Sequence, residues 1–119
     1  MHELGITQSI IDHARETAQA NGARRVTDIF LAMTPAADFS QESIEMYFDM
    51  LTGEDDYFMG ARLHFDHQPG AARCMGCGEV FTAHAQRETC PRCSSWTVAF
   101  DADAPAVQIT DIGIDDGRE

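Results

Sequence analysis

Four cysteines form two closely spaced pairs, Cys74 with Cys77 and Cys90 with Cys93, and twelve residues separate the pairs. Each pair has C-x-x-C spacing, which folds as a tight turn with backbone amides directed at the sulfur atoms. Two such turns at this separation can wrap four thiolates around one tetrahedral ion, and zinc prefers this ligand set. Because four thiolates leave no coordination position for water, we expect the zinc to be structural rather than catalytic.

Two other interpretations of the cysteines stay open. The first is a thiol redox protein, although a thioredoxin-type site usually has a single C-x-x-C pair at the start of a helix. The second is a mixed ligand set, since His84 lies between the pairs and can replace one thiolate. A thiol count before and after zinc removal separates the redox interpretation from the structural one.

A second group of metal-binding residues, Met1, His2 and Glu3, begins the chain. The α-amine of Met1, the amide of His2 and the His2 imidazole can close fused chelate rings on one ion. The set becomes nearly planar once the metal displaces the amide proton, and Glu3 can complete it through its amide or carboxylate. Planar nitrogen sets suit Ni(II) or Cu(II) rather than tetrahedral Zn(II). The enzyme that removes the initiator methionine prefers a small second residue, and His2 is bulky, so we expect Met1 to stay. The alternative interpretation of this segment is an exposed terminal histidine that binds no metal.

The charge balance limits the classes of partner. The chain has 8 Lys+Arg against 20 Asp+Glu, a net charge of −12. The main alternative function is a zinc-ribbon module that binds protein or nucleic acid. Nucleic acids and anionic membranes bind basic surfaces, so this charge balance argues against the nucleic-acid-binding form of that alternative. No apolar run approaches the ~20 residues of a transmembrane helix, and the start does not resemble a signal peptide. We therefore expect a cytoplasmic protein whose cysteines do not form structural disulfides.

His64, His67 and nearby acidic residues allow a metal-dependent hydrolase to be considered. His64 and Asp66 alternate to one face of an expected strand, whereas His67 points to the opposite face. Three ligands therefore do not converge on one ion, and a solvated polar face is the simpler interpretation. His13, in the first expected helix, is interpreted as a surface or interface residue.

The pattern of apolar residues predicts the elements that must position these groups. Helices are expected over residues 4–20 and, after a Ser40 cap, to Gly53; strands are expected over 26–33, 61–67 and from Val107 onward. This order predicts an α+β fold, with two helices packed on a three-stranded sheet and an inserted zinc-ribbon-like subdomain carrying the four cysteines. We expect a nickel-binding domain over residues 1–69 and 105–119, a zinc-binding domain over 70–104, and a polar linker over 101–105.

Several motifs together resemble one known family. They are the opening Met1-His2-Glu3, Gln41-Glu42-Ser43 before a helix containing Phe48, the run from Gly60 through Pro69 into Arg73-Cys74-x-x-Cys77-Gly78, and Cys90-Pro91-x-Cys93 before an apolar last strand. The chain is similar over essentially its whole length to the HypA/HybF family of nickel metallochaperones for hydrogenase maturation. It departs from the family pattern at Thr34-Pro35-Ala36-Ala37-Asp38 and at Ser94, where a glycine is common.

The resemblance implies a metal carrier rather than an enzyme. It implies that nickel binds at Met1, His2 and Glu3 as transient cargo, and that zinc is held at Cys74, Cys77, Cys90 and Cys93. The implied partners are a HypB-like GTPase of the maturation system and the precursor of the [NiFe]-hydrogenase large subunit, with urease as another possible nickel acceptor. An edge strand and a terminal helix would also allow a homodimer by exchange of elements.

Overall fold

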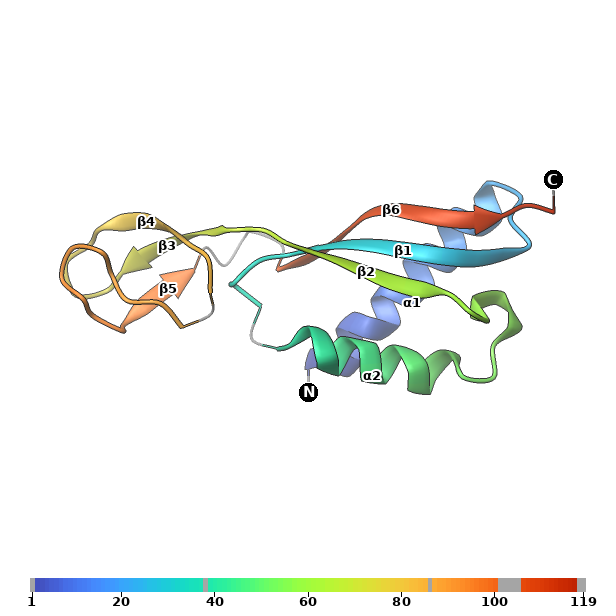
Figure 1. Ribbon diagram of the computed structural model, residues 1–119, viewed down its shortest axis with the longest axis horizontal. Coiled ribbons are helices and arrows are strands. Elements are labelled where there is room, and N and C mark those ends of the chain that lie inside the picture. Colours follow the sequence, from blue (N-terminus) through green and yellow to red (C-terminus); the bar gives the residue numbers. More distant parts are fainter. Residues whose placement is uncertain (1, 38, 86, 101–105, 118–119) are drawn as a thin grey trace. The chain divides into compact units, whose positions relative to one another are not determined.

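The computed structural model describes residues 2–37, 39–85, 87–100 and 106–117 of the 119-residue chain (Figure 1). It contains helices α1 (His2–Ala20) and α2 (Gln41–Thr52), the 3-10 helix η1 (Asp56–Phe58), and six strands. The strands are β1 (Arg25–Met33), β2 (Arg62–His67), β3 (Gly70–Cys74), β4 (Val80–Ala83), β5 (Val98–Phe100) and β6 (Val107–Asp115). The linker expected over 101–105 lies outside the described residues.

The chain divides into two compact units. Unit 1 comprises residues 1–31, 39–65 and 109–119, and unit 2 comprises 32–38 and 66–108. The sequence predicts a nickel-binding domain over residues 1–69 and 105–119 and a zinc-binding domain over 70–104. These boundaries, and the metal assigned to each domain, stay predictions. No helix in the described ranges combines the length and apolar character needed to cross a membrane.

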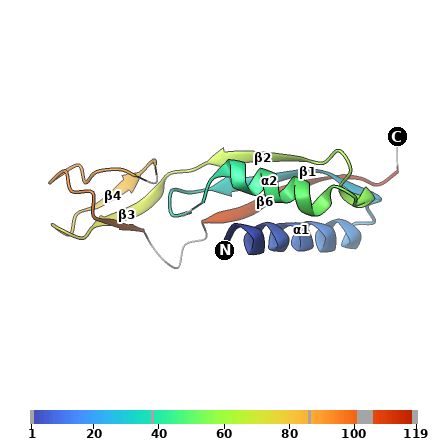
Figure 2. The same ribbon diagram turned by 90° about the horizontal axis from the view of Figure 1, so that it is seen from below.

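Unit 1 is built from both helices and a sheet with the strand order β2-β1-β6 (Figures 1 and 2). Its core is made by apolar side chains that recur at helical or alternating spacing, namely Ile10, Ile11, Ala14, Ala18, Val26, Ile29, Leu31, Ile44, Phe48 and Phe58. The Ser40 hydroxyl accepts a hydrogen bond from the Ser43 amide and so caps α2, as its position predicts. These elements confirm the expected α+β fold of two helices with a three-stranded sheet.

One ion pair secures the loop after α2 against α1. Arg15 Nη2 lies 2.5 Å from Asp55 Oδ2, and the guanidinium also stacks 5.0 Å from the centre of the Phe58 ring. The hydrogen bond from Arg15 holds the pKa of the Asp55 carboxyl below its ordinary value. Tyr57 adds a hydrogen bond from its hydroxyl to the Ala23 carbonyl at 3.1 Å. The acidic and aromatic segment after α2, residues 54–59, is therefore held by specific contacts within unit 1.

Unit 2 has a sheet of its own, which the sequence pattern only partly predicts. The central strand β3 pairs antiparallel with both β4 and β5, so that Ala72 lies opposite Phe81 on one side and Phe100 on the other. The alternation of Trp96, Val98 and Phe100 along the sequence is typical of a strand, and β5 covers its last part, from Val98 to Phe100. The Gly-Ala-Ala-Arg-Cys sequence of β3 carries almost no apolar pattern, and its strand conformation depends on pairing with two neighbours.

Candidate metal centres

The two cysteine pairs lie in turns with the same backbone hydrogen bonds. In the first turn the Gly78 amide donates to the Cys74 carbonyl at 2.9 Å, and in the second the Ser94 amide donates to the Cys90 carbonyl at 2.9 Å. Gly78 and Ser94 both have left-handed backbones, with φ of 79° and 62°. The local sequence thus builds two equivalent knuckles, and Ser94 adopts the conformation for which glycine is favoured.

This equivalence predicts opposite effects of two matched substitutions. Ser94→Gly should stabilise unit 2 by about 1 kcal/mol, because glycine avoids the steric cost of a left-handed backbone. Gly78→Ala should destabilise unit 2 by a similar amount; an added Cβ meets no atom within 4 Å, so backbone conformation alone is responsible. Urea unfolding followed by the fluorescence of the single tryptophan, Trp96, in the second knuckle region measures both changes. Shifts of the same sign would contradict the equivalence of the knuckles.

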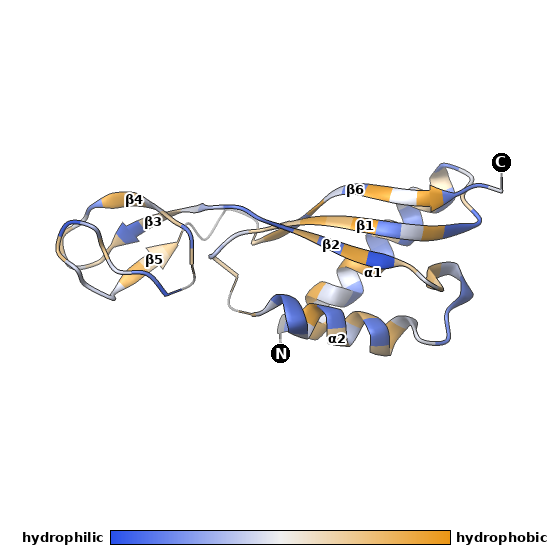
Figure 3. Cartoon of the chain, viewed as in Figure 1, coloured by the Kyte–Doolittle hydropathy of each residue, from blue (hydrophilic) through white to orange (hydrophobic). Residues whose placement is uncertain are grey.

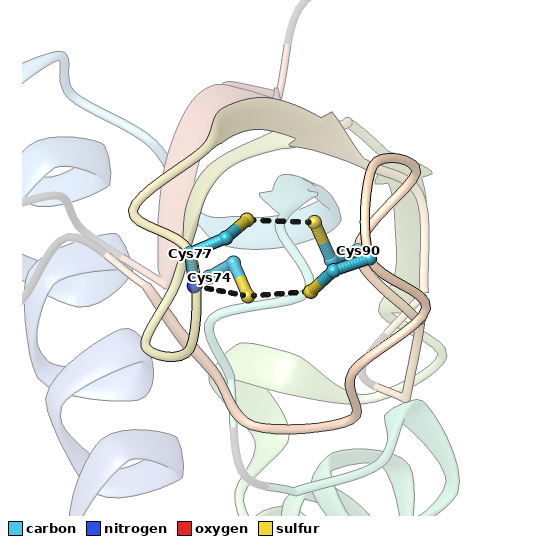
Figure 4. A group of neighbouring side chains, drawn as sticks. Cys74, Cys77 and Cys90 are labelled. Atoms are coloured by element: carbon cyan, nitrogen blue, oxygen red, sulfur yellow. Dashed lines mark hydrogen bonds between the residues drawn. The ribbon is translucent and has the colours of Figure 1, made fainter.

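The four cysteine sulfur atoms converge (Figure 4). All lie within 4.8 Å of one another, with Cys74 Sγ 3.5 Å from Cys93 Sγ and Cys77 Sγ 3.6 Å from Cys90 Sγ. These separations are much longer than the ~2.05 Å of a disulfide bond. A tetrahedron of thiolates with metal–sulfur bonds of ~2.3 Å has edges of ~3.8 Å, so the sulfur atoms are spaced to hold one metal ion.

Electrostatics in the cluster also favour a cation. The amides of Cys77 and Gly76 donate to Cys74 Sγ at 3.5 and 3.3 Å, and these bonds lower the pKa of the Cys74 thiol to about 6. The Ser95 amide favours the Cys93 thiolate, but the neighbouring sulfur atoms, that of Cys74 above all, outweigh it and raise the pKa of Cys93 to about 12. The pKa values of Cys74 and Cys93 are thus shifted in opposite directions, and a bound divalent cation would stabilise all four thiolates.

His84 does not join this group. Its side chain is exposed, and its backbone amide donates to Glu88 Oε2 at 2.6 Å. Within the described ranges the only set of three or more close cysteine, histidine or carboxylate ligands consists of the four cysteines. The geometry therefore favours a ligand set of sulfur atoms alone.

The expected nickel ligands at the start of the chain are only partly described. Met1 lies outside the described residues, and so does the side chain of His2. The backbone of α1 begins at His2, and Glu3 is half-buried in its first turn, where its carbonyl accepts from the Thr7 hydroxyl at 2.6 Å. The first amides of a helix have no carbonyl partner within it, so a metal can displace the proton of the His2 amide without breaking a helical hydrogen bond.

His64 has a partner that sequence reasoning missed. Its Nε2 lies 2.7 Å from Asp28 Oδ1, and its ring stacks on Phe30 with centroids 4.5 Å apart. The hydrogen bonds from His64 and Thr27 lower the pKa of Asp28. Asp28 lies 36 residues from His64 on another strand, and no short motif joins them. In the described part of the chain no third ligand completes a hydrolase-type site around this pair.

Comparisons with known proteins place the chain in a family. Residues 1–114 match the family model described as "Hydrogenase/urease nickel incorporation, metallochaperone, hypA". The chain is 33% identical over 96 residues to "Hydrogenase maturation factor HypA" of Dehalococcoides mccartyi, covering 81% of this chain and 80% of the relative. It is 34% identical over 95 residues to "Hydrogenase maturation factor HybF" of Klebsiella pneumoniae, covering 80% and 83%.

The fold is shared with a solved structure of the same family. The solution structure of the Ni metallochaperone HypA from Helicobacter pylori has a TM-score of 0.64 and 18% identity, and the similarity covers 95% of this chain and 97% of that one. The resemblance seen in the motifs therefore extends to the sequence and the fold as a whole. The chain belongs to the HypA family of hydrogenase/urease nickel incorporation metallochaperones.

Proposed function

We propose that the protein is a nickel carrier that binds Ni(II) at Met1, His2 and Glu3 and delivers it for maturation of [NiFe]-hydrogenase. The observation that carries the proposal is the family match over residues 1–114, which includes these three residues and all four cysteines. Relatives are named maturation factors, so we assign the protein a carrier role and no catalytic one. Its partners would be a HypB-like GTPase and the precursor of the hydrogenase large subunit, or a urease precursor, in the cytoplasm.

Residues at the start of α1 suit a transient site. The ligands come from one short terminal segment, so few bonds must break when the metal leaves. The amides at a helix N-terminus carry a partial positive charge, which opposes a bound cation by roughly 0.3–1 kcal/mol. Both effects keep the affinity moderate, as handing a metal onward requires.

The four cysteines would hold a resident zinc ion. The spacing of their sulfur atoms and the amides directed at Cys74 and Cys90 fit a tetrahedral thiolate site. A zinc ion with four thiolates supplies a cross-link to the fold and no open position for a substrate. Zinc would thus stabilise unit 2 while nickel passes through the site at the start of unit 1.

Metal analysis of untagged protein tests this division of roles. We expect one zinc per chain to survive treatment with a chelator that removes nickel, and one nickel per chain to bind when the salt is added back. Nickel should pass from the loaded protein to a purified large-subunit precursor, measured by separating the two proteins and analysing each. Protein that binds no nickel while retaining its zinc would contradict the carrier role.

The main alternative is a zinc-ribbon module that binds nucleic acid or another protein through unit 2. The net charge of −12 disfavours nucleic acid, and a gel-shift assay at low salt distinguishes the two functions. A shift of DNA or RNA that persists with His2→Ala would favour the alternative.

A further inference from the structure

Strand β6 forms one edge of the sheet in unit 1, with β1 as its only neighbouring strand among the described residues (Figure 1). The Asp115 carbonyl accepts from the amide of Arg24, directly before β1, at 2.6 Å. In an extended strand the N–H and C=O groups of successive residues point to opposite edges. The Ala106 carbonyl accepts from the Thr34 amide at 2.9 Å, so the alternation changes phase between residues 106 and 115. Counted from the nearer contact at Asp115, Gly113 faces β1, whereas Ile112 and Ile114 direct their backbone groups to the open edge.

The amide of Ile112 has an unusual partner. It donates to Oδ1 of the neighbouring Asp111 at 2.9 Å, not to a backbone carbonyl. A carboxylate on an edge strand occupies a donor that another strand would use, and so protects the edge against non-specific pairing. This protection is reversible, because Asp111 is exposed and can turn toward a cation.

A groove of about 430 Å³ lies beside this edge. Its lining comes from α1 and β6 and includes His13, Thr17, Ala18, Ile109, Ile112 and Ile114. Hydrophobic segments along β6 are separated by more polar ones (Figure 3), and the strand sequence includes Ile109, Ile112 and Ile114. Ile114 is 38% exposed, so the apolar wall is accessible to a ligand. The rest of the lining is largely polar and includes Asn21, Thr110 and Asp111. An open backbone edge next to a groove that offers both isoleucine and polar side chains is an arrangement that can bind an extended peptide as an added strand.

We propose that β6 and this groove bind an extended segment of a partner protein in which basic and apolar residues alternate. The apolar side chains enter the groove against Ile112 and Ile114, and the backbone pairs with these two residues. A Lys or Arg of the segment attracts the Asp111 carboxylate and frees the Ile112 amide for pairing. This binding surface is separate from the proposed metal sites and does not depend on either.

Charge selects a basic segment over a second copy of the chain. Two β6 strands side by side would bring Asp111 and Asp115 of both copies together in a protein of net charge −12. Like charges on adjacent strands are destabilising. A basic segment instead meets opposite charge at Asp111.

Binding of synthetic peptides tests the surface on the zinc-loaded full chain. The probe is a fluorescent seven-residue peptide that alternates lysine and valine. Its controls are the same peptide with glutamate for lysine, and a peptide with proline for valine that keeps the charge but cannot form a strand. In about 0.15 M salt, we expect anisotropy to show binding of the first peptide and at least roughly tenfold weaker binding of both controls.

Variants of β6 separate strand pairing from general charge attraction. Asp111→Asn keeps an acceptor for the Ile112 amide but removes the charge, and Ile112→Pro removes the amide; each should weaken binding roughly tenfold. Glu45→Gln makes the same charge change on the exposed side of α2 and should leave binding unchanged. In the unsubstituted protein, hydrogen exchange at Ile112 and Ile114 should slow on binding while exchange at Gly113 stays the same.

Three results would overturn the proposal. Equal weakening by Asp111→Asn and Glu45→Gln would show only general attraction to an acidic protein. Exchange that is unaffected at Ile112 and Ile114 would show that the peptide binds elsewhere. A dimer in sedimentation experiments that Ile112→Pro dissociates would mean that a second copy occupies the edge.

Discussion

Cys90→Ser is expected to abolish the proposed zinc binding and to unfold unit 2. Cys90 is only 1% exposed, and its sulfur lies 3.6 Å from that of Cys77. Structural zinc contributes about 10–16 kcal/mol of apparent binding energy, which is coupled to folding. Unit 2 has little else to stabilise it, because its buried apolar residues are mostly small: Met33, Ala37, Ala72, Cys74, Ala83 and Cys90. A core of this size does not hold a fold without a cross-link.

The experiment compares zinc content and local stability. Zinc per chain is measured by elemental analysis, and hydrogen exchange reports on each unit separately. We expect β3, β4 and β5 to lose protection while α1 and α2 keep theirs. Arg92→Ser is the matched control, since it places serine at an exposed position of the same knuckle and leaves the four sulfur atoms in place. A Cys90→Ser protein with one tightly bound zinc and a protected β3 would contradict the structural role.

An extension of two residues before Met1 is expected to abolish nickel binding while zinc content stays at one per chain. The extension converts the terminal amine of Met1 into an amide and moves the new amine away from the His2 imidazole, so the fused chelate rings cannot form. His2→Ala should have the same effect by removing the imidazole. Loss of an outer-shell partner of a metal ligand costs about 10–100-fold in affinity, so loss of a ligand itself should cost at least about 100-fold.

Isothermal titration with nickel measures the affinity of each variant, and circular dichroism checks the fold. His13→Ala is the control, because it removes an exposed histidine from the same helix and leaves the proposed ligands unchanged. Nickel affinity that is unchanged in the extended protein would refute the chelate at the start of the chain. An equal loss of nickel affinity in His13→Ala would instead indicate that the nickel site lies further along α1.

Interactions between residues that are close in the sequence determined the two cysteine turns, the helices and the strands of the first sheet. The C-x-x-C spacing predicts two tight turns, because the residues that make each turn are adjacent in the chain. Apolar residues at helical spacing predict α1 and α2, and Ser40 marks the start of α2 through a hydrogen bond three residues away. The strands of the first sheet follow from alternation along each segment. All these features depend on interactions within a few residues.

Contacts between distant segments were decided only by the tertiary structure. The four sulfur atoms share one site because two knuckles fold together, and the spacing alone allowed other ligand sets that included His84. The polar and alanine-rich β3 becomes a central strand through pairing with β4 and β5. The pairing of Asp28 with His64 and the open edge of β6 likewise depend on which strands are neighbours. A sequence pattern reports local preference, whereas strand neighbours and ligand geometry depend on how the whole chain minimises its free energy.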